Sequence, residues 1–191
     1  MPFSSLPYPV DLFRLHAAQP DRYPFLLQTL GGTPGWDILF AFPERQIIQR
    51  LGQPGSFLEL LDTAWQAEHS AHDPDSKASW LPFHGGWFVY LGYELLYEIE
   101  ASVPPRDLRS DFPVGLAARV PAAIMVDHEH DTTYLYTEPA HVDLLDLLKH
   151  DITHAPPYTA SGVTCDALVE EPPEQYLSGV ARIKRYIQAG D

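Results

Sequence analysis

The sequence predicts a folded domain of mixed class, in which short β-strands are combined with a few helices. Short strand-like runs fill the first two-thirds of the 191 residues, and a strand–turn–strand pattern and amphipathic helical segments accompany them. The apolar fraction of 45% is typical of globular proteins, and the length allows one domain and little more. Nineteen prolines, against an ordinary share of about 5%, predict long loops.

The charge balance and the single cysteine argue against several functional classes. The 12 Lys+Arg and 26 Asp+Glu give a net charge of −14, so binding to nucleic acid, which needs clustered basic residues, is not expected. Cys165 alone cannot form an internal disulfide or a cysteine-rich metal site, which fits a reducing cytosol. The sequence shows no signal-peptide pattern and no apolar run of about 18 residues. We therefore expect a soluble cytoplasmic protein without a membrane partner.

Three apolar runs in the first half predict strands. Residues 37–42 (DILFAF) are apolar on both faces after the first residue, which is typical of a buried strand. Residues 46–51 form a second candidate. Residues 87–91 (WFVYL) form a third, because they are rich in the aromatic and β-branched residues that strands favour.

A helix is expected between the second and third of these strands. Ser56 and Glu59 have the spacing of a capping box, in which each side chain bonds an otherwise unpaired backbone N–H. The residues that follow predict one buried apolar stripe at helical spacing, formed by Phe57, Leu61, Ala64 and Trp65. Residues 69–79 are polar and are expected to form a loop.

The second half of the chain begins with a predicted hairpin. Residues 122–126 and 132–136 are β-prone and flank the polar tract 127–131 (DHEHD). A short helix with leucines on one side is expected over residues 142–149. Residues 153–172 contain several prolines and little periodicity, so they predict a linker that ends a first domain of residues 1–172.

The last segment predicts a separate amphipathic helix within residues 173–191. Pro173 suits the first turn of a helix, and Gly190 suits its C-terminal cap. We expect its apolar stripe to dock on the first domain, to mediate a dimer or to be mobile; the stripe consists of Tyr176, Val180, Ile183 and Ile187.

Residues 127–131 are the first candidate for a metal site, because several potential ligands occur within five residues. A structural zinc site needs four ligands, and no second cluster supplies obvious partners. A solvated hairpin turn is therefore favoured over a histidine metal protein. The same reasoning applies to the polar loop with His69, His72, Asp73 and Asp75.

The remaining candidates form no catalytic set. The glycine pairs at 31–32 and 85–86 match no phosphate-binding pattern, so tight turns are expected there. Cys165 has no base nearby in the sequence. Glu94 and Glu98 would lie one turn apart on a helix that Gly92 opens, where a solvated face is favoured over acid–base chemistry.

Residues 82–94 (PFHGGWFVYLGYE) carry the most specific motif of the chain. They resemble the Pro-Phe-x-Gly-Gly…Gly-Tyr-[Asp/Glu] signature in the N-terminal domain of chorismate-utilising synthases, which are component I of aminodeoxychorismate (para-aminobenzoate) synthase and of anthranilate synthase. Other stretches resemble the same family in the same order. Residues 6–8 resemble its opening strand, residues 24–29 its Leu-Leu-Glu-Ser region, and residues 36–41 the strand after that region. Residues 176–191 resemble the first helix of its catalytic domain.

The resemblance implies an α+β fold whose antiparallel β-sheets form a sandwich-like core with flanking helices. In this family, a larger C-terminal catalytic domain binds chorismate and magnesium, and a separate glutamine amidotransferase supplies ammonia. The N-terminal domain can hold tryptophan. By their positions in the two motifs, the residues expected to line such a pocket here are Leu27, Gln28, Thr29, Pro82, Phe83 and Gly85.

Two departures from the family pattern change the expected function. Gln28-Thr29 replaces the Glu-Ser of the tryptophan motif, so a hydroxyl remains but the charge is lost. The magnesium-binding glutamates and the catalytic lysine of the family lie downstream of the part that this chain resembles. We therefore expect a non-catalytic domain, without a cofactor or metal of its own, from component I of an aminodeoxychorismate synthase in folate biosynthesis. The alternatives are the anthranilate enzyme of tryptophan biosynthesis and a stand-alone module that binds an amino acid.

Overall fold

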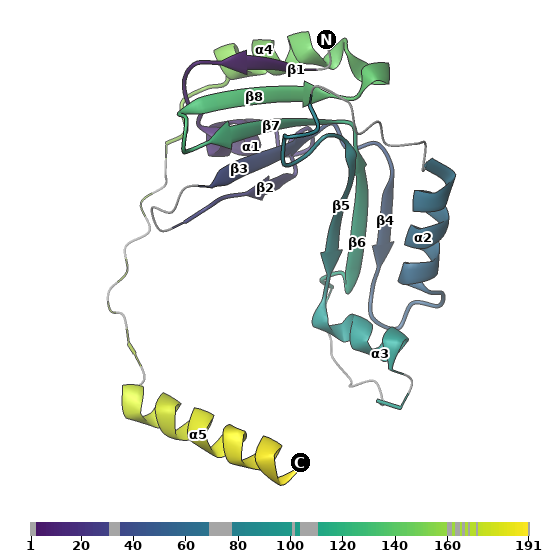
Figure 1. The fold of residues 1–191 in the computed structure, drawn as a ribbon, viewed down its shortest axis with the longest axis vertical. Coiled ribbons are helices and arrows are strands. Elements are labelled where there is room, and N and C mark those ends of the chain that lie inside the picture. Colours follow the sequence, from purple (N-terminus) through teal and green to yellow (C-terminus); the bar gives the residue numbers. More distant parts are fainter. Residues whose placement is uncertain are drawn as a thin grey trace. The chain divides into compact units, whose positions relative to one another are not determined.

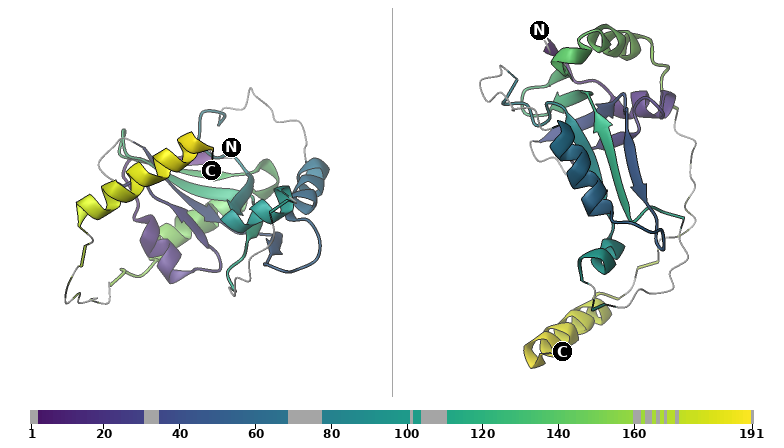
Figure 2. Two further views of the ribbon diagram at one scale, coloured as in Figure 1. Left: turned by 90° about the horizontal axis from the view of Figure 1, so that it is seen from below. Right: turned by 90° about the vertical axis from the view of Figure 1, so that its right-hand side faces the viewer.

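A computed structural model describes most of the chain, and Figures 1 and 2 show its helices and strands. The described residues are 3–30, 35–68, 78–100, 102–103, 111–159, 162, 165, 167, 169–170 and 172–190. The chain divides into two compact units, Met1–Tyr158 and Thr159–Asp191. The first unit has the predicted α+β class, with two antiparallel sheets and flanking helices.

The larger sheet has five strands in the order β1-β8-β7-β3-β2, all antiparallel. The strands are β1 (Phe3–Leu6), β2 (Phe25–Leu27), β3 (Trp36–Ala41), β7 (Ala122–Asp127) and β8 (Thr132–Thr137). The predicted strand at 37–42 and the predicted hairpin are confirmed. The expected opening strand at residues 6–8 is wrong, because β1 ends at Leu6 and Pro7 has no N–H to continue a ladder.

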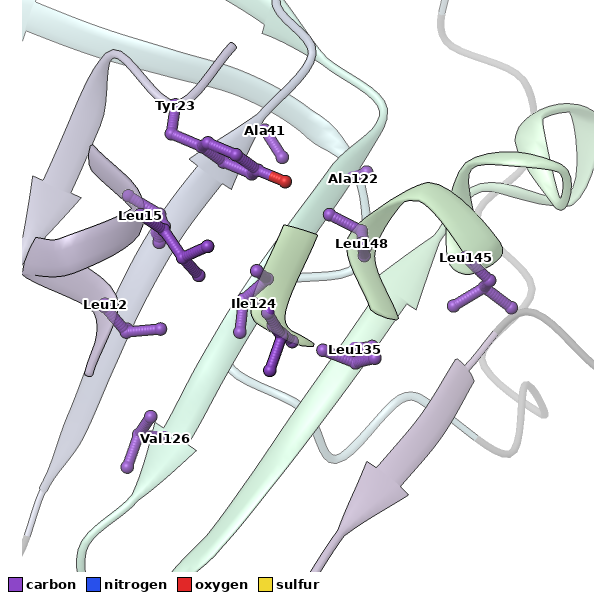
Figure 3. Close-up of a cluster of buried hydrophobic side chains, with 12 residues drawn as sticks. Leu12, Leu15, Tyr23, Ala41, Ala122, Ile124, Val126, Leu135, Leu145 and Leu148 are labelled. Atoms are coloured by element: carbon purple, nitrogen blue, oxygen red, sulfur yellow. The ribbon is translucent and has the colours of Figure 1, made fainter. Parts of the chain in front are cut away.

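The main core lies between this sheet and the helices α1 (Leu12–Ala18) and α4 (Leu144–His154), as Figure 3 shows. Leucines from both helices pack on alternate residues of the central strands, which are Leu39, Ala41, Ala122, Ile124, Val126 and Leu135. α4 continues five residues beyond its predicted end, because Ile152 belongs to the same buried face. The first two residues of the expected linker are therefore helical.

A buried polar network joins α4 to the segment between α1 and β2. The Asp151 carboxylate, 5% exposed, accepts hydrogen bonds from the Tyr23 hydroxyl and the Arg22 guanidinium, both at 2.6 Å. Burial alone would raise the pKa of Asp151, but these hydrogen bonds outweigh it and hold the pKa below its usual value. Burial and the bond to Asp151 raise the pKa of Tyr23, so the hydroxyl remains a donor.

The smaller sheet has three strands in the order β4-β6-β5. They are β4 (Gln46–Gln49), β6 (Gly115–Val120) and β5 (Gly86–Leu91), and α2 (Phe57–Glu68) covers one face. Phe57 and Ala64 are buried as predicted, and the Phe57 ring lies where a side chain at Gly115 would have to be. Trp65 is 49% exposed and lines an open groove beside β5, so its predicted burial is wrong.

The start of α2 is capped by two side chains. The Ser56 hydroxyl accepts a hydrogen bond from the N–H of Glu59 at 3.0 Å, which confirms the Ser56 half of the predicted capping box. Glu98 supplies the second capping side chain. It lies on α3 (Leu96–Ile99), which follows the short 3-10 turn η1 (Tyr93–Leu95). Its carboxylate accepts from the Ser56 hydroxyl at 2.5 Å and from the N–H groups of Phe57 and Leu58 at 3.0 and 2.9 Å. Glu98 is therefore neither a merely solvated carboxylate nor a free acid–base group.

The second unit contains α5 (Pro173–Ala189), which matches the predicted terminal helix. Gly190 has a positive φ of 88°, and its N–H donates to the carbonyl of Ile187, so the predicted C-terminal cap is confirmed. None of the described helices combines the length and the apolar character needed to cross a membrane.

Replacing Asp151 with Asn should lower the free energy of unfolding at pH 7 by about 2 kcal/mol, because Tyr23 and Arg22 lose a charged acceptor. The folded-state pKa of Asp151 lies below the ordinary value of about 3.9. The stabilisation is therefore complete above about pH 4 and is lost as the pH falls through the folded-state pKa. Urea denaturation over this pH range measures both effects.

Asp146→Asn is the matched control for that experiment, because this carboxylate lies on the same helix with its side chain 92% exposed. It should change the unfolding free energy by less than about 0.5 kcal/mol. Equal losses in the two variants would contradict a specific role of the buried network.

Replacing Glu98 with alanine should destabilise α2 by about 1 kcal/mol, the usual cost of losing an N-terminal cap. Hydrogen exchange should rise first at the N–H groups of Phe57 and Leu58, which lose their acceptor. Glu94→Ala, one turn earlier, should leave these amides unchanged. Unchanged exchange in the Glu98 variant would show that the cap is dispensable.

Candidate functional site

The two sheets meet where two strands continue from one sheet into the other. β3 leads to β4 through residues 42–45, and β6 leads to β7 through Pro121 alone. Figure 1 shows the strands of the two sheets running in crossing directions on either side of this corner. Phe42 takes a positive φ of 59° at the turn, and its N–H donates to the carbonyl of Arg22 at 2.8 Å. Phe25 of the first motif and Gly86 of the second pair with Phe40 and Val120, close to this corner.

Arg119 on β6 connects the elements at the corner by hydrogen bonds. Its Nη2 donates to both carboxylate oxygens of Glu138 at 2.7 Å, and its Nε donates to Glu68, at the end of α2, at 2.5 Å. Its Nη1 donates to the carbonyls of Gly86 and Val120, each at 3.1 Å. Burial alone would lower the pKa of Arg119, but the two carboxylates outweigh it and raise the pKa. All three nitrogens of the guanidinium therefore donate hydrogen bonds.

Aromatic rings fill the space between the sheets. Phe25 and Phe88 are stacked, with ring centroids 4.1 Å apart and planes 6° apart. Phe40 lies edge-on to Phe83 at 4.9 Å and to Phe88 at 5.2 Å. These rings come from β2, β3, the glycine motif and β5. The two sequence motifs that carry the family resemblance thus converge on β3 from distant parts of the chain.

The predicted pocket residues belong to two segments, namely the end of β2 with the two residues after it and the turn before β5. Leu27 pairs with Ile38 on β3, and Phe83 packs against the same strand, so these two approach a common face. Pro82 is exposed. Gly85 lies beside Glu138 and lines a different groove, next to α2. As a tryptophan-like pocket, the six residues remain a prediction.

Gln28 and Thr29 are bound to the start of β3. The N–H of Thr29 donates to Asp37 at 2.8 Å, and its hydroxyl donates to the carbonyl of Trp36 at 3.0 Å. The amide of Gln28 lies 3.5 Å from the same carboxylate, and Nε2 of His128 lies 3.0 Å from it. Sequence reasoning missed Asp37, which restores the negative charge that Gln28 lacks. Its position as the first residue of an otherwise apolar strand was the only signal.

A groove of about 530 Å³ lies between α2 and β5. Among the described residues, its lining is apolar except for Asp62 and consists otherwise of Leu58, Leu61, Trp65, Gly85, Gly86, Trp87 and Val89. Such a surface can hold apolar side chains.

A second cavity, of about 660 Å³, lies at the corner itself. Its lining includes Arg22, Phe42, Glu44 and His141. The Arg22 guanidinium lies 5.3 Å from the centre of the Phe42 ring and is bonded to Asp151, while Nε2 of His141 lies 3.0 Å from Glu44. Arg22 is thus held by Asp151 and His141 contacts Glu44, so these two lining side chains each contact a carboxylate.

The histidines of the predicted hairpin contact two different carboxylates. Nδ1 of His130 lies 2.8 Å from Asp127, and this contact raises the pKa of His130, whereas His128 faces Asp37. Asp127 also accepts the N–H of Glu129 at 2.9 Å, which closes the turn. The favoured hairpin interpretation is confirmed. Within the described residues, no three His, Cys, Asp or Glu side chains are grouped to hold a metal ion.

The three remaining candidates from the sequence are Cys165, the polar loop with His69 and the glycine pair at 31–32. Cys165 is exposed and donates to the carbonyl of Ala167 at 3.4 Å. The loop with His69, His72, Asp73 and Asp75 lies outside the described residues, as does the glycine pair at 31–32.

Comparison with known proteins gives one informative similarity. No protein-family model matches the chain. An anthranilate synthase component I-like protein from Synechocystis sp. is 25% identical over 145 residues. The match covers 73% of this chain and 29% of that protein, so the chain spans about three-tenths of the length of its relative. The similarity supports a relationship to the chorismate-utilising family.

Replacing Gly85 with alanine should lower the free energy of unfolding by about 3 kcal/mol. Its φ is +92°, and a side chain there would collide with Glu138, which Arg119 holds in place. Gly52→Ala is the control for backbone strain alone, because Gly52 has a φ of +79° and a side chain there would meet no neighbouring atoms. This variant should lower the free energy of unfolding by about 1 kcal/mol. Thermal and urea unfolding compare the two variants, and equal losses would exclude the contact with Glu138 as a cause.

Proposed function

We propose that this chain is the non-catalytic N-terminal domain of component I of an aminodeoxychorismate synthase. In this proposal the complete enzyme aminates chorismate to 4-amino-4-deoxychorismate in the cytoplasm, for the synthesis of para-aminobenzoate and folate. The domain supports a C-terminal catalytic domain that binds chorismate and magnesium. It also contacts the glutamine amidotransferase that supplies ammonia.

The observation that carries this proposal is the convergence of the two family-like motifs. Phe25 comes from the first motif, Phe88 and Phe83 come from the second, and all three pack around Phe40 of β3. Segments about sixty residues apart therefore form one packed unit, which supports the proposal. The similarity to the Synechocystis protein supports the same family.

The choice of aminodeoxychorismate over anthranilate rests on the surroundings of Gln28 and Thr29. The Thr29 hydroxyl donates to a backbone carbonyl, and Asp37 accepts bonds from the backbone and from two side chains. These groups are engaged within the protein, which disfavours a feedback site for the ammonium group of tryptophan.

Anthranilate synthase component I is the second candidate, because the Synechocystis relative is named after it. A stand-alone domain that binds an amino acid is the third. Its support is the presence of Asp37 beside Gln28 and Thr29, since a carboxylate next to a hydroxyl can bind an ammonium group.

The complete gene product, incubated with chorismate, glutamine, magnesium and the amidotransferase, should form 4-amino-4-deoxychorismate, identified by chromatography and mass spectrometry. Formation of anthranilate would replace the proposal with the second candidate. Absence of both products, with an amidotransferase shown to release ammonia, would overturn the family assignment.

Calorimetric titration of the 191-residue chain with tryptophan tests the third candidate. We expect no binding in the micromolar range, because the polar groups beside Gln28 are already bonded. Micromolar binding that Asp37→Asn abolishes would instead favour the amino-acid-binding domain. Val126→Ala, on the neighbouring strand, serves as a control for general destabilisation.

A further inference from the structure

Strand β5 lies at an edge of the three-stranded sheet. In the described part of the chain it pairs with β6 on one side and with no strand on the other. Figure 1 shows it at the border of the sheet. Its six residues, GWFVYL, carry no charge. The free side of β5 is therefore a backbone edge that another strand could extend.

The composition of β5 is that of an interior strand. Trp87, Val89 and Leu91 alternate with Phe88 and Tyr90, so the side chains on both faces are apolar. A strand with one solvated face usually alternates apolar and polar residues. Yet Val89, Tyr90 and Leu91 are 40%, 37% and 57% exposed.

The other three sheet edges are better protected. β1 carries Ser4 and Ser5, β2 has only three residues, and β4 has glutamine at both ends. Short length and polar residues are the usual means of keeping an edge strand from pairing. β5 is neither short nor polar, so of these four edge strands it is the one best suited to pair with a further strand.

The groove of about 530 Å³ between α2 and β5 borders the same strand. Trp87 and Val89 form part of its lining, together with Trp65 and Leu61 of α2. A strand added to the edge of β5 would direct every second side chain toward the α2 face of the sheet. The groove therefore offers room for apolar side chains of the added strand.

We propose that two copies of this chain form a two-fold symmetric dimer in which β5 pairs antiparallel with β5. Pairing centred on Val89 places Trp87 opposite Leu91 of the partner subunit, and Phe88 opposite Tyr90 of the partner subunit. Facing residues of an antiparallel pair share one face of the sheet, so every facing pair is apolar. The two sheets become one sheet of six strands.

The charge of the chain agrees with this position. A net charge of −14 makes two copies repel one another. The contact must therefore lie on an uncharged patch, and β5 supplies one without charged side chains. A six-residue edge with one adjoining groove is small beside interfaces of roughly 1,200–2,000 Å², so we expect a dissociation constant of about 10–100 μM.

Sedimentation velocity of the 191-residue chain, from about 2 to 400 μM, should show a shift from monomer to dimer. Val89→Lys places two ammonium groups opposite each other at the two-fold axis and should weaken the dimer at least tenfold. Ile48→Lys is the matched control, because Ile48 lies on β4, at the opposite edge of the same sheet, and is 39% exposed. This variant should dimerise like the unmodified chain.

A mixture of Val89→Lys and Val89→Glu should form a heterodimer, because opposite charges then meet at the axis. A monomer at all concentrations would overturn the proposal. So would a dimer that Val89→Lys leaves intact, since its contact would lie elsewhere, for example on α5. If Val89→Lys fails to fold, amide exchange of the unmodified chain decides. The amides of β5 should be more protected at 400 than at 2 μM, and equal protection would reject the dimer.

Discussion

The ion pair of Arg119 with Glu138 is the contact on which the arrangement of the first unit depends. Arg119 belongs to the smaller sheet, and Glu138 directly follows β8 of the larger one. The same guanidinium also binds Glu68 at the end of α2 and the carbonyl of Gly86 at the start of β5. Because all three of its nitrogens donate hydrogen bonds in a half-buried site, the group sets how helix, turn and both sheets meet.

Each sheet is stabilised on its two faces by different kinds of packing. The larger sheet buries leucines against α1 and α4 on one face, and the aromatic rings around Phe40 on the other. The smaller sheet receives α2 on one face and shares those rings on the other. Two carboxylates within this framework, those of Asp151 and Glu98, each accept several hydrogen bonds. The helices are thereby tied to distant segments of the chain.

The polar cluster at Asp37 changes the meaning of the altered motif. A Gln-Thr pair appears in the sequence as the loss of a charge, but in the fold the Asp37 carboxylate lies against both residues. A glutamate at position 28 would bring a second carboxylate toward Asp37, and two like charges at this distance repel strongly. Glutamine at position 28 is therefore compatible with the Asp37 carboxylate beside it. The two positions are nine residues apart, and the pairing of β2 with β3 brings them together.

The sequence by itself determined the elements whose pattern is local. These are the apolar run of β3, the hairpin around residues 127–131, the Ser56 cap and the terminal helix with its glycine. The central strand β6 escaped prediction, because GLAARV has small residues and an arginine in place of β-branched ones. The tertiary structure alone decided that Glu98 caps α2 and that Arg119 joins the sheets. It also decided that β5, interior in composition, lies at an edge. Burial on one face of a helix or strand produces a periodic pattern of apolar residues in the sequence. The order of strands in a sheet, and hydrogen bonds between distant residues, produce no such pattern.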